Sequence, residues 1–219
     1  MNQTKAADAA TKGRLIRWAR AYDRLLAVLT LGREAALRRE IVARAALRPG
    51  ERVLDIGCGT GTLAIAAAET QPACEVLGID PASAMVARAR EKARATGVTA
   101  RFEVGAIEKL PADDASFDVV LSSLMLHHVP EESRVEGLRE VRRVLRPGGR
   151  LVLVDFAGRT LLFHGILARL TGRSAIASPA VEHVEREVTE AGFERPSVHA
   201  MSFRYLFCLV ANKPGSGPS

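Results

Sequence analysis

Three glycines within five residues follow an apolar run and form the most distinctive chemical feature of this chain. The segment Val53–Thr62 reads as a buried strand, a tight turn containing Gly57, Gly59 and Gly61, and the beginning of a helix. Glycine is needed where the backbone takes positive φ angles or lies against a ligand. In open α/β sheets such a turn, at the carboxyl end of the first strand, is where ligands bind.

The spacing of the turn and its neighbouring acid narrow the kind of ligand. Dinucleotide-binding turns have the pattern G-x-G-x-x-G, but Thr62 stands at the third glycine position here. Asp55 lies two residues before Gly57, where it would repel a pyrophosphate. The same carboxylate suits a ligand that carries an ammonium and a sulfonium. Asp55 and Thr62 therefore disfavour a nicotinamide-dependent oxidoreductase.

A second acid, Asp80, closes the next apolar run 23 residues after Gly57. A carboxylate at this place can accept hydrogen bonds from both hydroxyls of a ribose. Asp80 could instead cap a helix that begins near Ser83. Its distance from the glycine turn favours ribose binding.

These residues resemble a known family. Val53–Gly61 resembles motif I of the class I S-adenosylmethionine-dependent methyltransferases, and Asp80 resembles their ribose-binding acid. Three further segments resemble the family's fourth strand, the turn into its fifth strand and the segment that covers the adenine: Phe117–Val120, Leu145–Leu151 and Gly105–Pro111. The resemblance covers Arg52–Phe156 and the C-terminal hairpin, and the ubiquinone/menaquinone biosynthesis methyltransferases are the most similar branch.

The resemblance implies S-adenosyl-L-methionine as the cofactor. It also implies a set of residues that bind it: Asp55, Gly57, Cys58, Gly59, Gly61, Asp80, Pro81, Met85, Ala106, Ile107 and Ser122. Ala106 departs from the family pattern, which often has an Asp there that bonds the adenine amino group. Losing one such bond costs about 1 kcal/mol. Ile107 can still pack on the adenine and donate its backbone amide, whereas Met85 flanks the other side of the ring or belongs to the core.

Two adjacent histidines follow the expected fourth strand and are the titratable candidates for catalysis. The cofactor supplies the leaving group in methyl transfer, so the protein positions the acceptor and removes a proton where one is present. Imidazole is a suitable general base, and we favour His128 over His127. Either histidine could instead bond the backbone where the next helix begins. Some phosphobase methyltransferases pair such a histidine with a tyrosine of the N-terminal helix, and Tyr22 is the candidate here. No set of metal ligands is visible.

The fold class follows from strands that alternate with helices, which indicates right-handed βαβ units and a parallel sheet. We expect a doubly wound, mostly parallel, seven-stranded α/β sheet of Rossmann-like type, with an antiparallel C-terminal hairpin and an N-terminal helical cap. The expected strands are Arg52–Gly57, Glu75–Asp80, Arg101–Gly105, Phe117–Ser123, Arg150–Phe156, Glu194–Ala200 and Ser202–Ala211. The expected helices are Arg14–Leu31, Arg33–Leu47, Gly61–Thr70, Ser83–Thr96, Pro130–Leu145 and Pro179–Ala191.

The chain is expected to form a single domain over residues 14–212, with the helical cap at 14–48. Residues 1–13 and 213–219 are small, polar or rich in Gly and Pro, and we expect them to be disordered. An insertion at 157–178 contains the apolar segment Thr160–Leu170. That segment either lines the acceptor pocket or forms a buried helix on the sheet.

Charge is concentrated near the N-terminus. Residues 1–50 contain 11 Lys and Arg against 4 acids, while the other 169 residues contain 20 against 21. The stripe Leu15, Trp18, Tyr22, Leu25 and Leu29 lies beside three arginines on the expected first helix. This basic amphipathic helix either contacts an anionic membrane peripherally or packs over the cofactor as a lid. Unpaired cysteines, and no apolar stretch long enough for a signal or a span, predict a cytoplasmic protein.

The acceptor is expected to be a small, apolar or amphipathic molecule of quinone, lipid or polyketide type. DNA amino-methyltransferases carry an Asn/Asp-Pro-Pro-aromatic tetrad where this chain has Ser122–Met125, so a nucleic-acid acceptor is not expected. Two alternatives stay open: a phospholipid-headgroup N-methyltransferase, and a non-catalytic partner subunit that binds S-adenosylmethionine. The methylated atom and the oligomeric state are left open.

Overall fold

The computed structural model describes residues 8–13, 30, 32–158 and 178–215. Its seven strands form one sheet in the order β3-β2-β1-β4-β5-β7-β6. The strands are β1 Arg52–Ile56, β2 Glu75–Asp80, β3 Ala100–Val104, β4 Phe117–Ser123, β5 Leu145–Phe156, β6 Ser197–Ala200 and β7 Leu206–Asn212. The first five are parallel to one another, whereas β7 runs antiparallel to both β5 and β6. The predicted mostly parallel sheet with an antiparallel C-terminal pair is confirmed.

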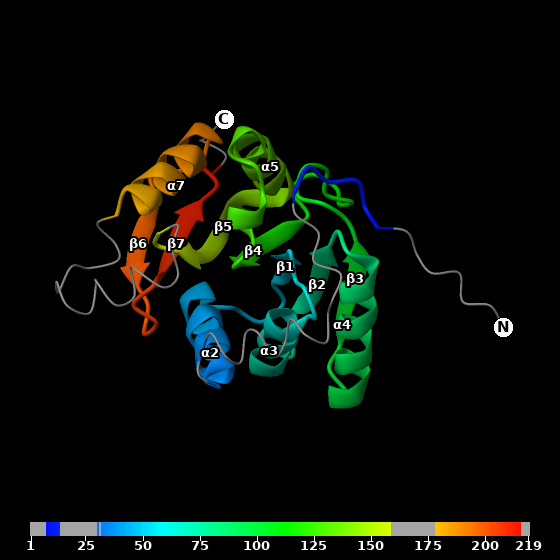
Figure 1. Cartoon of the computed structure of the whole chain (residues 1–219). Coiled ribbons are helices and arrows are strands. Elements are labelled where there is room, and N and C mark those ends of the chain that lie inside the picture. Colours follow the sequence, from blue (N-terminus) through cyan, green and yellow to red (C-terminus); the bar gives the residue numbers. More distant parts are fainter. Residues whose placement is uncertain (1–7, 14–29, 31, 159–177, 216–219) are drawn as a thin grey trace.

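Helices cover both faces of this sheet (Figure 1). The helices α2 Glu34–Ala45, α3 Thr62–Thr70 and α4 Ser83–Thr96 lie on one face, and α5 Glu131–Val144 and α7 Pro179–Glu190 lie on the other. Cap residues stop or start these helices. Gly97 is the C-cap of α4, and its positive φ of 70° suits glycine. Ser178 is the N-cap of α7, and its hydroxyl accepts a hydrogen bond from the Val181 amide. A doubly wound, three-layer domain results.

The central strands supply a core to each helical layer. Consecutive residues of a strand point to opposite faces of the sheet. In β1, Val53 packs in the core shared with α2, α3 and α4, while Leu54 packs in the core shared with α5 and α7. In β4, Val119 packs in the first of these cores and Val120 in the second. All four side chains are fully buried. Burial on both faces explains why these strands are continuous apolar runs.

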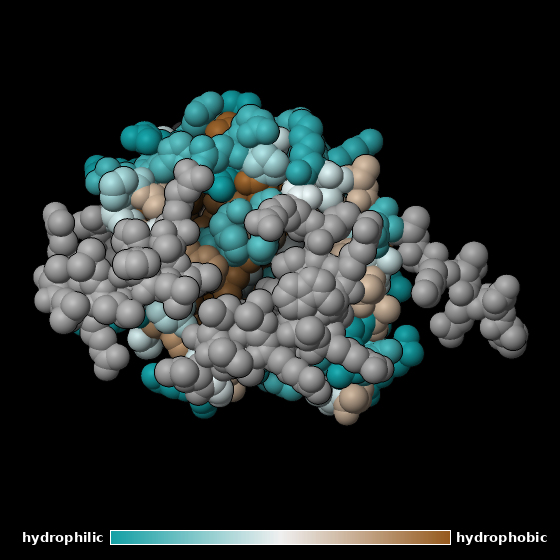
Figure 2. Space-filling view, viewed as in Figure 1, coloured by the Kyte–Doolittle hydropathy of each residue, from teal (hydrophilic) through white to brown (hydrophobic). Residues whose placement is uncertain are grey.

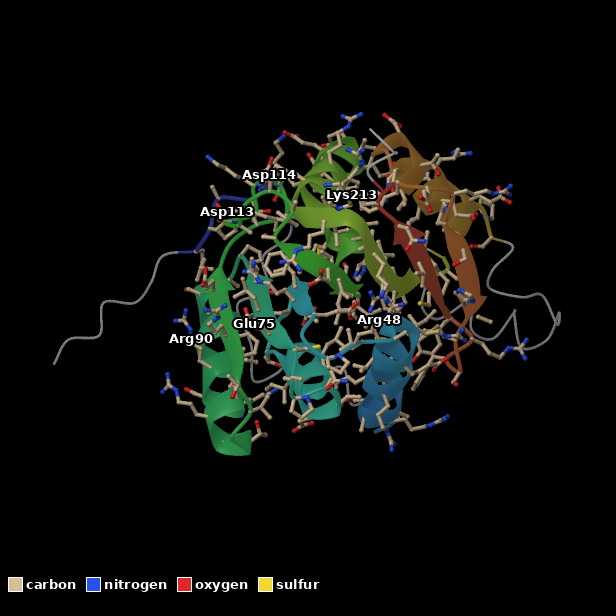
Figure 3. The ribbon with its side chains drawn as sticks, turned by 180° about the vertical axis from the view of Figure 1, so that it is seen from behind. Arg48, Glu75, Arg90, Asp113, Asp114 and Lys213 are labelled. Atoms are coloured by element: carbon tan, nitrogen blue, oxygen red, sulfur yellow. The ribbon has the colours of Figure 1, made fainter. Side chains whose placement is uncertain are left out.

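The strand order reverses between β1 and β4, which are neighbours in the centre of the sheet. A crevice forms at such a point, beyond the carboxyl ends of the strands, and ligands bind there in open α/β sheets. The glycine turn follows β1 directly, and the two histidines follow β4. The amino ends of the strands lie opposite. Arg48 comes just before β1 and Glu75 is the first residue of β2, so both belong to that end of the sheet (Figure 3).

Several segment boundaries differ from those predicted. Strand β5 begins at Leu145 rather than Arg150, because Leu145 already pairs with Phe117 of β4. Residues 8–13 were expected to be disordered, but they bond to the domain: the Ala9 amide donates to the Pro81 carbonyl at 2.9 Å. Lys213 was assigned to a disordered tail, yet its ammonium donates to the Leu145 carbonyl at 2.6 Å.

Three sequence predictions concern residues that the structure does not describe. They are the helix Arg14–Leu31 apart from Thr30, the insertion 157–178 apart from its end residues, and the candidate Tyr22. Within the described ranges, no helix is long and apolar enough to cross a membrane.

Candidate active site

The glycine turn is held against β2 and covered by one side chain from the β4 end. The Cys58 amide donates to the Ile79 carbonyl at 3.0 Å, and the Gly61 amide donates to the Cys58 carbonyl at 2.9 Å. Gly57 has a φ of 64°, and a Cβ added to it would lie 2.2 Å from Cγ of Met125. Any larger residue at 57 would therefore be strained and would displace Met125.

Gly61 has a packing function rather than a place in a pocket wall. A Cβ added there would lie 2.7 Å from both Ala89 of α4 and Phe102 of β3. The residue is the N-cap of α3 and has a φ of 77°. Its lack of a side chain thus allows the start of α3 to lie close to its neighbours.

Asp80 ties the glycine turn to the start of α4. Its Oδ2 accepts a hydrogen bond from the Gly59 amide and its Oδ1 accepts one from the Ala82 amide, both at 2.9 Å. Each carboxylate oxygen has two lone pairs, so each keeps one acceptor site for a ligand hydroxyl. Burial raises the pKa of Asp80, and the negative charge of Asp8 raises it further. Helix-start bonding and ribose binding are therefore compatible functions of the same side chain.

Asp55 is deeply buried beside the turn, with 1% of its surface exposed. Its Oδ2 accepts a hydrogen bond from the Ala64 amide in the first turn of α3 at 3.1 Å. Burial raises the pKa of Asp55 to about 8, and the nearby charge of Asp80 adds to the rise. A cation arriving beside this carboxyl would favour its ionised form. The arrangement suits a positively charged ligand.

Two cavities open on either side of the glycine turn. The first encloses about 650 Å³ including its open mouth and is bounded by Asp80, Pro81, Met85, Ile107 and residues of the turn. We call it the β2-side pocket. Its wall also contains Thr11, Gly13, Met125, His128 and Val129. Carboxylate oxygens at one side and apolar side chains at the other suit a ribose joined to a flat ring.

The second cavity, the α2-side pocket, encloses about 550 Å³ including its open mouth. Its wall combines Asp55 and the turn with Glu34 and Arg38 of α2. Arg38 pairs with Glu34 at 3.3 Å across one helical turn. Both pockets share Gly57, Gly59 and Leu124, so they lie next to each other at the turn. Charges of both signs meet in this second pocket.

A histidine and a carboxylate come together at the ends of β4 and β5. Nδ1 of His127 lies 2.7 Å from Oδ1 of Asp155, and the His127 amide donates to Oδ2 of Asp155 at 3.0 Å. Asp155 is 4% exposed, whereas the His127 side chain is 35% exposed. The pair borders an open cleft whose wall includes Phe156 and residues of α7. A buried carboxylate that orients an accessible imidazole is the geometry of a general base.

On the face of the molecule seen in Figures 1 and 2, hydrophobic surface is visible near the middle, between more hydrophilic regions (Figure 2). The β2-side pocket takes much of its wall from apolar residues, among them Ile56, Leu124 and Val129. An apolar wall next to charged groups favours a ligand with both characters.

Comparison with known proteins identifies the family. A family described as "Methyltransferase domain" matches residues 53–149. A demethylmenaquinone methyltransferase from Deinococcus radiodurans is 37% identical and shares 88% of each chain with this protein. The chain belongs to the class I S-adenosylmethionine-dependent methyltransferases. It is a methyltransferase, and S-adenosylmethionine is its cofactor.

Other relatives of this methyltransferase differ in the reactions they are named for. A 27-O-demethylrifamycin SV methyltransferase from Amycolatopsis mediterranei is 38% identical over 71% of this chain and 58% of its own length. The solved structure of the [4+2]-cyclase SpnF superposes with a TM-score of 0.67, at 22% identity, over 97% of this chain and 88% of that one. Such a likeness shows the fold alone, which hosts more than one reaction.

The structure brings most of the predicted cofactor residues of the methyltransferase to the two pockets. Asp55 and Cys58 line the α2-side pocket, and Asp80, Pro81, Met85 and Ile107 line the β2-side pocket. Burial and the neighbouring carboxylates raise the pKa of the Cys58 thiol well above its usual value, so it is a neutral group.

Three predicted residues line neither pocket: Gly61, described above, Ser122 and Ala106. Ser122 is 3% exposed within the sheet, and its neighbour Ser123 lines the α2-side pocket in its place. Ala106 is buried, whereas the adjacent Ile107 reaches the β2-side pocket. Ser122 and Ala106 alternate with the residues that face the ligand space.

The histidines of the methyltransferase face different spaces. His128, the preferred base in the sequence analysis, lines the β2-side pocket, and His127 lines the open cleft with Asp155. The orienting carboxylate was not singled out from the sequence. The sequence feature that could have revealed it is the position of Asp155 near the end of β5, the strand that pairs with β4, which leads to His127. This geometry favours His127 over His128 as the base.

Proposed function

We propose that this methyltransferase methylates a hydroxyl group of a small apolar or amphipathic acceptor of quinol or polyketide type, and that His127 removes the hydroxyl proton. The contact between His127 and Asp155 at 2.7 Å carries the proposal. A hydroxyl is a poor nucleophile until it loses its proton, so a positioned base matters more for oxygen than for a neutral amine.

The cofactor is placed across the glycine turn. Its adenosyl part fits the β2-side pocket, where Asp80 keeps two free acceptor sites for the ribose hydroxyls and Ile107 and Met85 provide apolar surface. The amino-acid part fits the α2-side pocket, where Asp55 meets the ammonium and Arg38 meets the carboxylate. Met125 lies over Gly57 between the two pockets and has to swing aside.

The residues of the chain supply orientation and proton removal. When bound, S-adenosylmethionine would supply a methyl carbon on a sulfonium: the acceptor oxygen would bond to that carbon as the carbon–sulfur bond breaks and S-adenosylhomocysteine leaves. Asp155 accepts the hydrogen bond from Nδ1–H of His127, which leaves Nε2 as the basic atom. Nε2 takes the proton from the acceptor hydroxyl, and the buried carboxylate stabilises the imidazolium that results.

The relatives support an acceptor of this type. One is named for demethylmenaquinone and another for the 27-O position of a rifamycin, and of these two names only the second states that an oxygen is methylated. The charged rim of the open cleft, with Glu131, Arg134 and Arg186, lies beside the apolar Phe156 and Val184. A cleft of mixed character fits a ring system that bears polar groups.

The test offers the purified enzyme three acceptor classes with radiolabelled methyl donor: a demethylated quinol, a phenolic polyketide and phosphoethanolamine. We expect transfer to a hydroxyl oxygen of the quinol or the polyketide, and transfer to a ring carbon of the quinol would contradict the proposal. Transfer to phosphoethanolamine alone would contradict the proposal and support the headgroup methyltransferase. Cofactor binding without transfer to any of the three would contradict the proposed acceptor classes.

A pair of matched variants tests the base. His127→Ala should lower kcat by roughly 10²–10⁴-fold, the usual contribution of general acid–base catalysis, with cofactor affinity unchanged. His128→Ala is the control, because its imidazole lines the β2-side pocket instead. A larger loss of kcat in His128→Ala than in His127→Ala would restore His128 as the base.

A further inference from the structure

Residues 8–13 form a strap whose first half is anchored at the beginning of α4. Oδ1 of Asp8 accepts hydrogen bonds from the amide and the hydroxyl of Ser83, both at 2.9 Å. The Ala9 amide donates to the Pro81 carbonyl at 2.9 Å. Pro81 follows Asp80 directly, so the strap starts beside the proposed ribose site. Figure 1 shows this segment in blue, separate in sequence from the elements it crosses.

The second half of the strap is anchored on the other side of the β2-side pocket. Oε1 of Glu108 accepts two hydrogen bonds at 2.9 Å, from the Thr11 hydroxyl and from the Lys12 amide. Gly13 then lies against the short 3-10 helix η1 Leu126–His128, since a Cβ added to it would be 3.4 Å from the His128 carbonyl oxygen. The strap thus crosses the pocket, and both Thr11 and Gly13 line it.

The hydrogen bonds of the Thr11 hydroxyl determine whether this residue of the pocket wall can donate to a ligand or accept from it. A hydroxyl has one proton to donate and two lone pairs that accept. The proton goes to Glu108, because the Thr11 hydroxyl donates to Oε1 of that residue at 2.9 Å. The Gly13 amide donates to the same hydroxyl oxygen at 2.9 Å and takes one lone pair. One lone pair of Thr11 remains, so the hydroxyl offers a ligand an acceptor and no donor.

The apolar side chains around this acceptor increase its contribution to ligand specificity. Ile107 and Met85, which share the pocket wall, have no polar side-chain atoms that donate or accept strongly. A ligand group in an apolar pocket gains specificity from the few polar atoms that face it. An acceptor at this place selects a ring that carries a hydrogen-bond donor.

We propose that Thr11 is a cofactor-specificity residue whose hydroxyl oxygen accepts a hydrogen bond from the exocyclic amino group of the purine. Glu108 is a positioning residue: it holds the hydroxyl proton away from the pocket and so keeps the oxygen as an acceptor. The inference rests on the placement of the adenosyl group in the β2-side pocket proposed above. A purine with a carbonyl oxygen in place of the amino group would set acceptor against acceptor.

The experiment compares the affinities of S-adenosylhomocysteine and S-inosylhomocysteine by isothermal titration, since the inosyl compound carries that carbonyl. The wild-type enzyme should prefer the adenosyl ligand by about tenfold or more, because the mismatch leaves two acceptors unpaired. Thr11→Val keeps the shape and removes the hydroxyl, so the preference should fall about fivefold or more. Any preference that remains comes from ring N1, which accepts a hydrogen bond in the adenosyl compound and carries a proton in the inosyl compound. Thr11→Ser retains the hydroxyl and should retain the preference.

The positioning function of Glu108 has its own signature. Glu108→Ala frees the Thr11 proton to point at the ligand, so the inosyl compound should gain affinity relative to the adenosyl compound. Glu108→Gln keeps a side-chain oxygen that accepts the hydroxyl proton, and it should restore the wild-type preference.

Two results would overturn the inference, and a third would overturn its basis. If Thr11→Val weakens both ligands equally, or neither, the hydroxyl only ties the strap to Glu108. If Glu108→Ala leaves the ligand preference of the wild type unchanged, the positioning function is wrong. If Asp80→Asn folds and binds S-adenosylhomocysteine as tightly as the wild type, the placement of the cofactor fails first.

Discussion

Replacing Asp55 with Asn should stabilise the fold and impair the cofactor site at the same time. The pKa of Asp55 is raised to about 8 by burial, from 3.8 in the absence of such effects. Because the folded protein holds this proton more tightly than the unfolded chain, the contribution of Asp55 favours folding fully below about pH 4. It is lost as the pH rises towards 8.

The size of the effect follows from this difference. At pH 7, about 3 units above the unperturbed pKa of 3.8, keeping the buried carboxyl protonated or burying its charge costs about 4 kcal/mol, since one unit is worth 1.36 kcal/mol. Asn retains an oxygen that can accept the Ala64 amide hydrogen, and it does not titrate. Asp55→Asn should therefore exceed the wild type in free energy of unfolding by several kcal/mol at pH 7, and by much less at pH 4.

Urea unfolding at pH 4, 5.5, 7 and 8 measures this difference, and calorimetry measures its counterpart in binding. If the ammonium of the cofactor binds the ionised carboxylate, roughly one proton should be released per S-adenosylhomocysteine bound at pH 7. Titrations in buffers of different ionisation enthalpy detect that proton, and Asp55→Asn should release none from this site. A stability difference that is constant between pH 4 and 8, or equal proton release by both proteins, would refute the reasoning.

Four further predictions concern the same pockets and the N-terminal helix. Asp80→Asn should weaken S-adenosylhomocysteine by about 2–3 kcal/mol through two charge-assisted hydrogen bonds, measured by calorimetry on a variant shown to be folded. Arg38→Ala should weaken that ligand about tenfold and leave an analogue without the carboxylate unaffected; equal losses would contradict the carboxylate contact. Met125→Ala should speed cofactor association about threefold or more in stopped-flow measurements, because the side chain no longer has to leave the space above Gly57. Anionic vesicles at low salt should blue-shift the fluorescence of Trp18, the only tryptophan, and salt should reverse the binding. No cosedimentation with vesicles would leave the basic helix as a lid.

The conformation of the glycine turn and the place of the two acids at one end of the sheet were predictable because their determinants are local in sequence. Within ten residues the sequence indicates a strand, a glycine turn and a helix start. Gly57 and Gly61 have the positive φ angles that this pattern requires. Asp80 was found from its place at the end of the next strand. Parallel strands bring their carboxyl ends to one end of the sheet, which places both acids there.

The sequence by itself determined the sheet, the cofactor class and the two acidic groups, since alternation of strands and helices and the spacing of glycines are properties of neighbouring residues. The tertiary structure alone decided which of two adjacent histidines has a carboxylate partner, because Asp155 lies 28 residues from His127 and reaches it only through the pairing of β4 with β5. It also decided that Thr11 meets Glu108 across 97 residues, in a segment whose polar composition predicted disorder. Composition reports whether a segment can form a core of its own; it carries no information on which distant carboxylate will hold it in place.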